Sequence, residues 1–185
     1  MMIPILLAAA APFFSPILDK PVPEWPEKAA SRWINSPPLT LAGLRGKVVL
    51  IRFFMESECP YCRATAPSLN EFHREFASQG LVVIGMYTPK PKPRPVTTDE
   101  VRKHVAAYGF AFPVAVDDDW GADNRLWLDR EPEAEATSAS LLIDRKGVLR
   151  HVQEGGEYAK TSADPKARAD YEAMRAAIIR LLAER

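Results

Sequence analysis

Two short apolar runs, separated by an amphipathic segment, occupy the middle of the chain. Residues 47–54 and residues 81–86 are almost continuously apolar, which is typical of strands covered on both faces. Between them, apolar side chains recur at helical spacing, and they include Leu69, Phe72 and Phe76. The pattern predicts a strand, a helix and a strand in one crossover unit, with the two strands parallel.

Two further helices are indicated by their end signals. Thr97 followed by Glu100 forms a capping box, and Gly109 can end the helix that it starts. Asp164 and Pro165 supply an N-cap and a first-turn proline for a last helix. Both segments carry an apolar stripe, so each helix is expected to pack on a sheet.

The remaining strands are short. Residues 113–116 predict a third strand, and residues 139–143 and 148–152 flank a turn that ends in glycine, which predicts an antiparallel hairpin. Residues 89–95 alternate proline with basic residues, and we expect them to form an extended, exposed loop. The order of strands and helices indicates an α/β fold with a mixed sheet.

The N-terminal part differs in composition. Residues 1–11 form an apolar run ending in alanines that resembles a signal peptide, although it lacks a basic start, and it is too short for a stable membrane span. Residues 12–38 are rich in proline and predict an extended arm. We therefore expect an N-terminal extension over 1–32 and one domain over 33–185, exported to the periplasm or a similar compartment. The alternative is a cytoplasmic protein that keeps this N-terminus.

Composition limits the partners. The chain has 185 residues, of which 47% are hydrophobic and 26% charged, as in an ordinary globular domain. Its 24 Lys and Arg residues balance 24 Asp and Glu residues. A nucleic-acid-binding protein would use a positive field to find phosphates, so nucleic acid is not an expected partner.

The only two cysteines form the segment Cys59-Pro60-Tyr61-Cys62. A bridge across so short a loop removes little unfolded-state entropy, and two cysteines supply half of a tetrahedral zinc site. Redox chemistry is therefore favoured, with no metal and no cofactor. At a helix start, unpaired N–H groups and the helix dipole stabilise a thiolate, so we assign Cys59 as nucleophile and Cys62 as the resolving cysteine.

Several blocks of the sequence resemble one family. The Cys59 to Cys62 motif, a proline five positions after it, a Phe-Pro-Val-Ala-Val-Asp block and a Leu-Ile-Asp-Arg-Lys-Gly block resemble the thioredoxin superfamily, and most closely its TlpA/ResA-like redoxin branch, over residues 33–155. The resemblance implies a thioredoxin-like fold, a central mixed sheet flanked by helices. It also implies dithiol-disulfide exchange with protein thiol or disulfide substrates and with an upstream redox partner, in a direction that the sequence does not fix.

The chain departs from the family beside the cysteines. Thr137-Ser138 stands where the family has an X-Pro pair with a cis bond, in the segment that pairs with substrate. A cis bond before serine costs about 2.5–4 kcal/mol, so we predict a trans bond. Glu58 replaces a common tryptophan, and the buried acid of relatives is missing, which leaves Glu56 and Glu58 as candidate proton-transfer groups or as solvated loop acids.

The two residues between the cysteines are also assigned a role, and two alternative functions remain open. Pro60 and Tyr61 are assigned to the substrate groove, where Tyr61 offers an aromatic surface. A thiol peroxidase on the same fold is one alternative, although Glu56 stands where peroxiredoxins have Thr or Ser. A non-enzymatic metal-binding or interaction module is the other alternative, motivated by the missing cis-proline.

Overall fold

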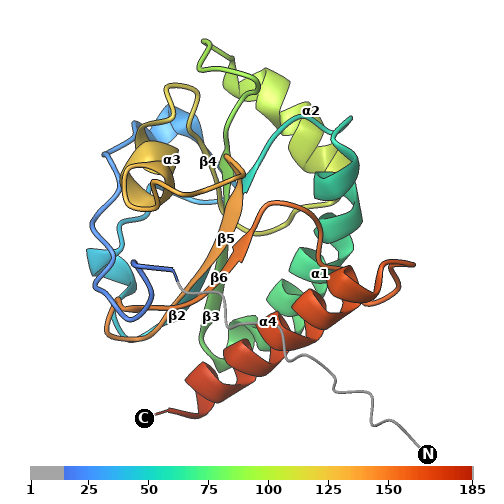
Figure 1. Ribbon diagram of the computed structural model, residues 1–185. Coiled ribbons are helices and arrows are strands. Elements are labelled where there is room, and N and C mark those ends of the chain that lie inside the picture. Colours follow the sequence, from blue (N-terminus) through green and yellow to red (C-terminus); the bar gives the residue numbers. More distant parts are fainter. Residues whose placement is uncertain (1–14, 185) are drawn as a thin grey trace, which may run out of the picture.

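The computed structural model describes residues 15–184 and shows a mixed six-stranded sheet between layers of helices (Figure 1). The strand order across the sheet is β1-β4-β3-β2-β5-β6. The strands are β1 (Trp33–Ile34), β2 (Val48–Phe54), β3 (Leu81–Tyr87), β4 (Val114–Val116), β5 (Ala139–Ile143) and β6 (Leu149–Glu154). The helices are α1 (Pro60–Phe76), α2 (Thr98–Tyr108), α3 (Gly121–Asp123), which continues into a π-helical turn over Asn124–Leu128, and α4 (Pro165–Ala183). Single 3-10 turns cover Ala30–Arg32, Ala42–Leu44 and Ala77–Gln79.

The predicted crossover unit is confirmed. Strand β2 pairs in parallel with β3, helix α1 connects them, and β4 adds a second parallel pair. Strand β5 runs antiparallel to β2 and forms the predicted hairpin with β6. This arrangement puts the end of β2 and the start of α1 at one edge of the sheet, where open sheets of this kind usually bind ligands.

The helix ends agree with the end signals in the sequence. The side chain of Thr97 accepts a hydrogen bond from the backbone of Glu100, and Gly109 adopts the left-handed conformation after α2. Asp164 caps α4 through the backbone N–H of Lys166. Side-chain acceptors at these positions satisfy N–H groups that a helix leaves unpaired.

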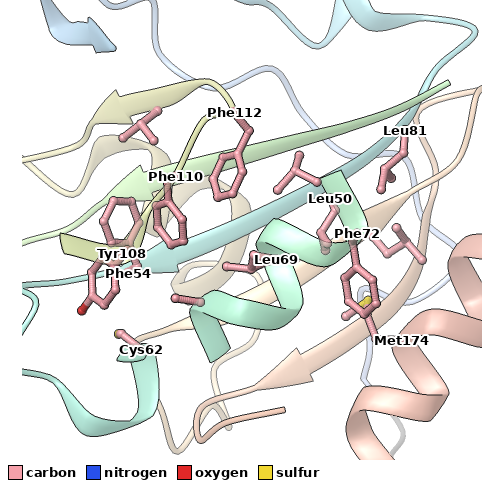
Figure 2. Close-up of a cluster of buried hydrophobic side chains, with 14 of the residues drawn as sticks. Leu50, Phe54, Cys62, Leu69, Phe72, Leu81, Tyr108, Phe110, Phe112 and Met174 are labelled. Atoms are coloured by element: carbon pink, nitrogen blue, oxygen red, sulfur yellow. The ribbon is translucent and has the colours of Figure 1, made fainter. Parts of the chain in front are cut away.

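Each face of the sheet is covered by different elements. Leu50 and Phe54 of β2 pack with helices α1, α2 and α4, and Figure 2 shows part of this cluster. The alternate residues Val49, Ile51 and Phe53 pack on the other face, against α3 and the N-terminal arm. The sheet is therefore buried on both faces, as its apolar strands predict.

The N-terminal arm contributes side chains to the core. Ile17, Val22 and Trp25 are buried, and Trp25 donates a hydrogen bond from Nε1 to the Leu39 carbonyl at 3.0 Å. The expected signal-like segment, residues 1–11, lies outside the described residues. Within residues 15–184, none of the helices combines the length and the apolar character needed to cross a bilayer.

The proline-rich loop after β3 is only partly as expected. Residues 91–93 are exposed, in agreement with the prediction, but Pro89 is buried and both ends of the loop are bonded to the rest of the fold. The Pro89 carbonyl accepts a hydrogen bond from Trp120 at 2.8 Å, and Lys90 and Arg94 contact carboxylates. The prediction of a fully solvated loop is wrong because its basic side chains find acidic partners distant in sequence.

Candidate functional site

The two cysteines lie at the start of helix α1, directly after β2. Cys59 is the N-cap residue and Pro60 the first helical residue. The sulfur of Cys59 accepts a hydrogen bond from the backbone N–H of Cys62 at 3.4 Å. Both cysteines are free thiols in this structure, with Cys59 half-buried and Cys62 only 4% exposed. One sulfur can therefore be reached from solvent, while the other lies behind it.

The surroundings of Cys62 disfavour its charged form. Burial raises the pKa of the Cys62 thiol to about 11, and the positive charge of Arg52 partly offsets this effect. Tyr108 lies beside Cys62 (Figure 2), and burial, followed by the charges of Cys62 and Cys59, raises the pKa of its phenol. At neutral pH, Cys62 is therefore a thiol next to a neutral phenol.

Helix α2 holds the loop that leads to the cysteines. The hydroxyl of Tyr108 donates a hydrogen bond to the Glu56 carbonyl at 2.6 Å. The backbone N–H of Ser57 donates to Nδ1 of His104 at 3.1 Å, and Arg63 donates to the Ser57 carbonyl at 2.9 Å. These bonds fix the loop from two helices, so the position of the Cys59 sulfur depends on α2 as well as on α1.

Both candidate acids have partners other than the cysteines. The carboxylate of Glu56 pairs with Arg94 at 3.1 Å, and Arg94 also pairs with Glu100 at 3.1 Å. Glu58 is exposed, and its carboxylate accepts a hydrogen bond from the Ser57 hydroxyl at 3.3 Å. The arrangement matches solvated or ion-paired loop acids more closely than proton-transfer groups.

The Tyr61 side chain projects from the site. It is 57% exposed, one of the few large apolar side chains on the described surface. A cavity of about 430 Å³ opens beside it, lined also by Glu154 at the end of β6 and by Glu157 just after this strand. Tyr61 is the one residue of the cysteine motif that lines this cavity.

The segment at Thr137 and Ser138 lies beside the same edge. Strand β5 pairs with β2 through Ser140 and Arg52, and Ser138 lies two residues back along this antiparallel ladder, toward the end of β2. In the described residues, only the bond between Lys90 and Pro91 is cis, so the trans bond predicted before Ser138 is confirmed. The Thr137 carbonyl accepts a hydrogen bond from Lys90 at 3.3 Å.

A buried ion pair lies behind this segment. The Lys90 ammonium is 3.5 Å from the Asp123 carboxylate and 4.1 Å from the centre of the Trp120 ring. Burial raises the pKa of Asp123 to about 7, and burial lowers that of Lys90. Sequence reasoning missed this pair because helix α2, strand β4 and the loops around them separate its members along the chain.

Sequence reasoning also missed Arg52. Its side chain is 1% exposed and donates hydrogen bonds to Ser140 at 3.3 Å, Gln153 at 3.0 Å and the Gly156 carbonyl at 3.1 Å. The available signal was a single charged residue inside an otherwise apolar strand. No cluster of three or more His, Cys, Asp or Glu side chains suited to a metal ion occurs in residues 15–184.

Comparisons with known proteins agree with this arrangement. The family model described as the AhpC/TSA family matches residues 21–152. DipZ from Mycobacterium tuberculosis is 34% identical over 142 residues, which span 72% of this chain but only 19% of DipZ. The thiol-disulfide oxidoreductase YkuV from Bacillus subtilis is 27% identical over 143 residues, which span 77% of this chain and 89% of YkuV.

Solved structures share the fold. A thiol-disulfide isomerase from Corynebacterium glutamicum superposes with a TM-score of 0.63 and 26% identity, over 89% of this chain and 97% of that chain. A thioredoxin family thiol:disulfide interchange protein from Chlorobium tepidum superposes with a TM-score of 0.59 and 20% identity, over 88% of this chain and 95% of that chain. The chain has a thioredoxin-like fold and belongs to the AhpC/TSA family.

Proposed function

We propose that this protein is a thiol-disulfide oxidoreductase in which Cys59 exchanges with a substrate disulfide and Cys62 resolves the intermediate. The observation that carries the proposal is the unequal exposure of two free thiols at the N-terminus of α1, with Cys59 half-buried and Cys62 buried. Unpaired N–H groups at a helix start stabilise a thiolate, and a thiolate is the attacking species in disulfide exchange.

The reaction proceeds in two exchanges. The Cys59 thiolate attacks one sulfur of the substrate disulfide, a mixed disulfide forms, and the other substrate sulfur leaves with the electron pair and takes up a proton. Cys62 then attacks the Cys59 sulfur, so the bond to substrate breaks and the bond between Cys59 and Cys62 forms. The substrate gains two electrons as two thiols, and the protein loses them as a disulfide. Run backwards, the same steps oxidise a dithiol substrate.

The expected partners are proteins. The exposed ring of Tyr61 and the cavity beside it provide a surface for a polypeptide next to the cysteines. A second redox partner must return the Cys59 and Cys62 pair to its starting state after each turnover, because the pair is altered by every exchange. We place the protein in the periplasm or another exported compartment, where protein disulfides persist.

The test is a redox titration in glutathione buffers combined with turnover of a model protein disulfide. Wild type is expected to turn over, Cys59→Ser to lose activity, and Cys62→Ser to accumulate a mixed disulfide that mass spectrometry identifies. That trapped species also names the physiological partner when it is isolated from cells. If neither substitution alters turnover, the proposal is wrong.

A peroxide assay separates this function from that of a thiol peroxidase. The expected rate of peroxide consumption by the reduced protein is no greater than that of free cysteine. A rate well above this value, lost in Cys59→Ser, would replace the oxidoreductase function with a peroxidase function.

A further inference from the structure

Strand β2 places one full charge inside the protein. Arg52 is 1% exposed, and within the described residues no carboxylate lies within ion-pair distance of it. Its three acceptors, from Ser140, Gln153 and Gly156, are all neutral. Among the described residues, Nε of Arg52 has no hydrogen-bond partner. A guanidinium cannot lose its proton in proteins, and burying a charge without an opposite charge is unfavourable.

The strand places this charge on the face of the sheet that helix α1 covers. Side chains alternate along β2, and Leu50 and Phe54, on either side of Arg52, both belong to the cluster that contains Cys62. The guanidinium lies 5.8 Å from the centre of the Tyr158 ring. The backbone N–H of Tyr158 donates to Thr65 at 3.4 Å, and Thr65 is one helical turn beyond Cys62.

We propose that Arg52 is the fixed counter-charge of the Cys62 thiolate, and that it acts through Cys62 to speed the resolution of the mixed disulfide. The inference deepens the proposed function and rests on it for its kinetic consequence. Arg52 is a buried cation without a carboxylate partner, and Cys62 is a buried thiol on the same face of the sheet. When Cys62 ionises, its negative charge balances the positive charge of Arg52.

The step that Arg52 assists is balanced within the proposed reaction. Cys62 gives its proton to solvent, its thiolate attacks the Cys59 sulfur, and the substrate sulfur leaves with the electron pair and is protonated. The positive charge of Arg52 favours the intermediate in which the negative charge resides on Cys62. Without this charge, Cys62 would ionise even less readily than it does, and the attack would be slower.

Other groups also face Cys62 and would contribute to its titration. Cys59 lies on the same helix, and a thiolate there opposes ionisation of Cys62, whereas the backbone of Met55 favours it through a hydrogen bond. Tyr108 approaches from α2 and Lys90 from the loop after β3, and each responds to the charge on Cys62. Arg52 is the largest of the favourable influences, so its removal should be visible above the rest.

The test measures the Cys62 thiol directly. Carbon NMR titration of Cys62, labelled at Cβ in a Cys59→Ser background, reports thiol ionisation without interference from tyrosines. Replacing the charge in Arg52→Gln is expected to raise the pKa of Cys62 by about one unit or more. Arg52→Lys keeps the charge and should restore most of the difference. Ser140→Ala is the matched control, since it removes one neutral partner of Arg52 and leaves the charge.

The second measurement is the single-turnover rate of resolution as a function of pH. One unit of pKa lowers the thiolate fraction about tenfold, but a more basic thiolate is more nucleophilic, so the net loss is about three- to fourfold per unit. The loss should be the same at every pH well below the wild-type pKa of Cys62, because both thiols are then mostly protonated and the ratio of their thiolate fractions is constant. An unchanged Cys62 pKa in Arg52→Gln, or equal effects of Arg52→Gln and Arg52→Lys, overturns the proposal. The titration needs no substrate, so it tests the interaction of Arg52 with Cys62 even if the protein shows no disulfide exchange.

Discussion

The Lys90 ammonium lies 3.5 Å from the buried carboxylate of Asp123 and also donates a hydrogen bond to the Thr137 carbonyl at 3.3 Å. One ion pair thus connects the loop after β3, helix α3 and the segment at the start of β5. These three pieces of chain are far apart in sequence, so the pair fixes the geometry of the edge of the site. Breaking the pair should lower the stability of the protein and loosen the structure around it.

Replacing the lysine of this pair is expected to be strongly destabilising at alkaline pH. Lys90→Met leaves the Asp123 carboxylate buried without its counter-charge, which costs about 3–5 kcal/mol in typical buried pairs. Urea unfolding at about pH 9 measures the change in the free energy of unfolding, which is obtained by linear extrapolation to zero denaturant. Lys92→Met is the control, because Lys92 is exposed in the same loop and should change stability by less than about 0.5 kcal/mol.

Asp123 also predicts a pH dependence with a definite sign. Burial raises its pKa to about 7, whereas the unfolded value is about 3.9. Between these values the native state binds more protons than the unfolded state, so stability falls as pH rises, by up to about 1.4 kcal/mol per pH unit. The contribution is fully present below about pH 4 and lost through about pH 7. Asp123→Asn should lack this slope in urea unfolding, and equal slopes in the two proteins would contradict the assignment.

Much of the architecture follows from local signals. The capping box at Thr97, the left-handed Gly109 and the proline at the start of α1 each act within a few residues, so the sequence predicts them without knowledge of the fold. The strand pairs follow from apolar runs in the same way. The two cysteines carry their own signal, because their spacing and their place after a buried strand already indicate redox chemistry.

The rest of the site depends on contacts that no local pattern contains. Arg52 is bonded to residues about a hundred positions away, and nothing near it in sequence indicates which groups would satisfy a buried guanidinium. Helix α3 begins after Trp120, whose positive φ of 60° is unusual for a bulky side chain. The indole N–H of Trp120 is bonded to the distant Pro89 carbonyl. Glu56 was a reasonable candidate acid from its position, but Arg94 pairs with it across the loop.

Removing the hydroxyl of Tyr108 is expected to loosen the loop before the cysteines. Tyr108→Phe removes the hydrogen bond to the Glu56 carbonyl and is expected to cost about 0.5–1.5 kcal/mol. Amide hydrogen exchange should become faster in residues 55–58, because the loop loses one of its attachments to α2. Tyr61→Phe makes the same chemical change beside the cysteines on an exposed ring and should leave both measurements unchanged.

His104 predicts a related but distinct result. Its Nδ1 accepts the hydrogen bond from Ser57, while its ring stacks on Tyr87 at a centroid distance of 5.6 Å. His104→Phe keeps the stack and removes the acceptor, which leaves a partly buried N–H unpaired at a cost of about 1–3 kcal/mol. Chemical denaturation measures the loss. His151→Phe, on β6, is the control, and a similar loss in both variants would argue against a specific role for the Ser57 bond.

The arm predicts a large effect of one apolar substitution. Trp25 is buried in the cluster on the far face of the sheet, and Trp25→Ala should lower the free energy of unfolding by about 3–5 kcal/mol. Trp25→Phe keeps most of the volume and loses the bond to Leu39, so a loss of about 1–2 kcal/mol is expected. Thermal unfolding compares the two. A negligible effect of Trp25→Ala would mean that the arm does not contribute to the fold in solution.

The same arm also affects how the edge of the sheet can pair with other molecules. Strand β6 is the last in the sheet, and the backbone of Asp19 and Lys20 occupies both polar groups of Leu149 on its outer side. An uncovered strand border offers such groups to neighbouring chains and invites fibrous self-association. Asp19 and Lys20 lie along the start of this border, so the polypeptide itself occupies the first pairing position that another copy could use.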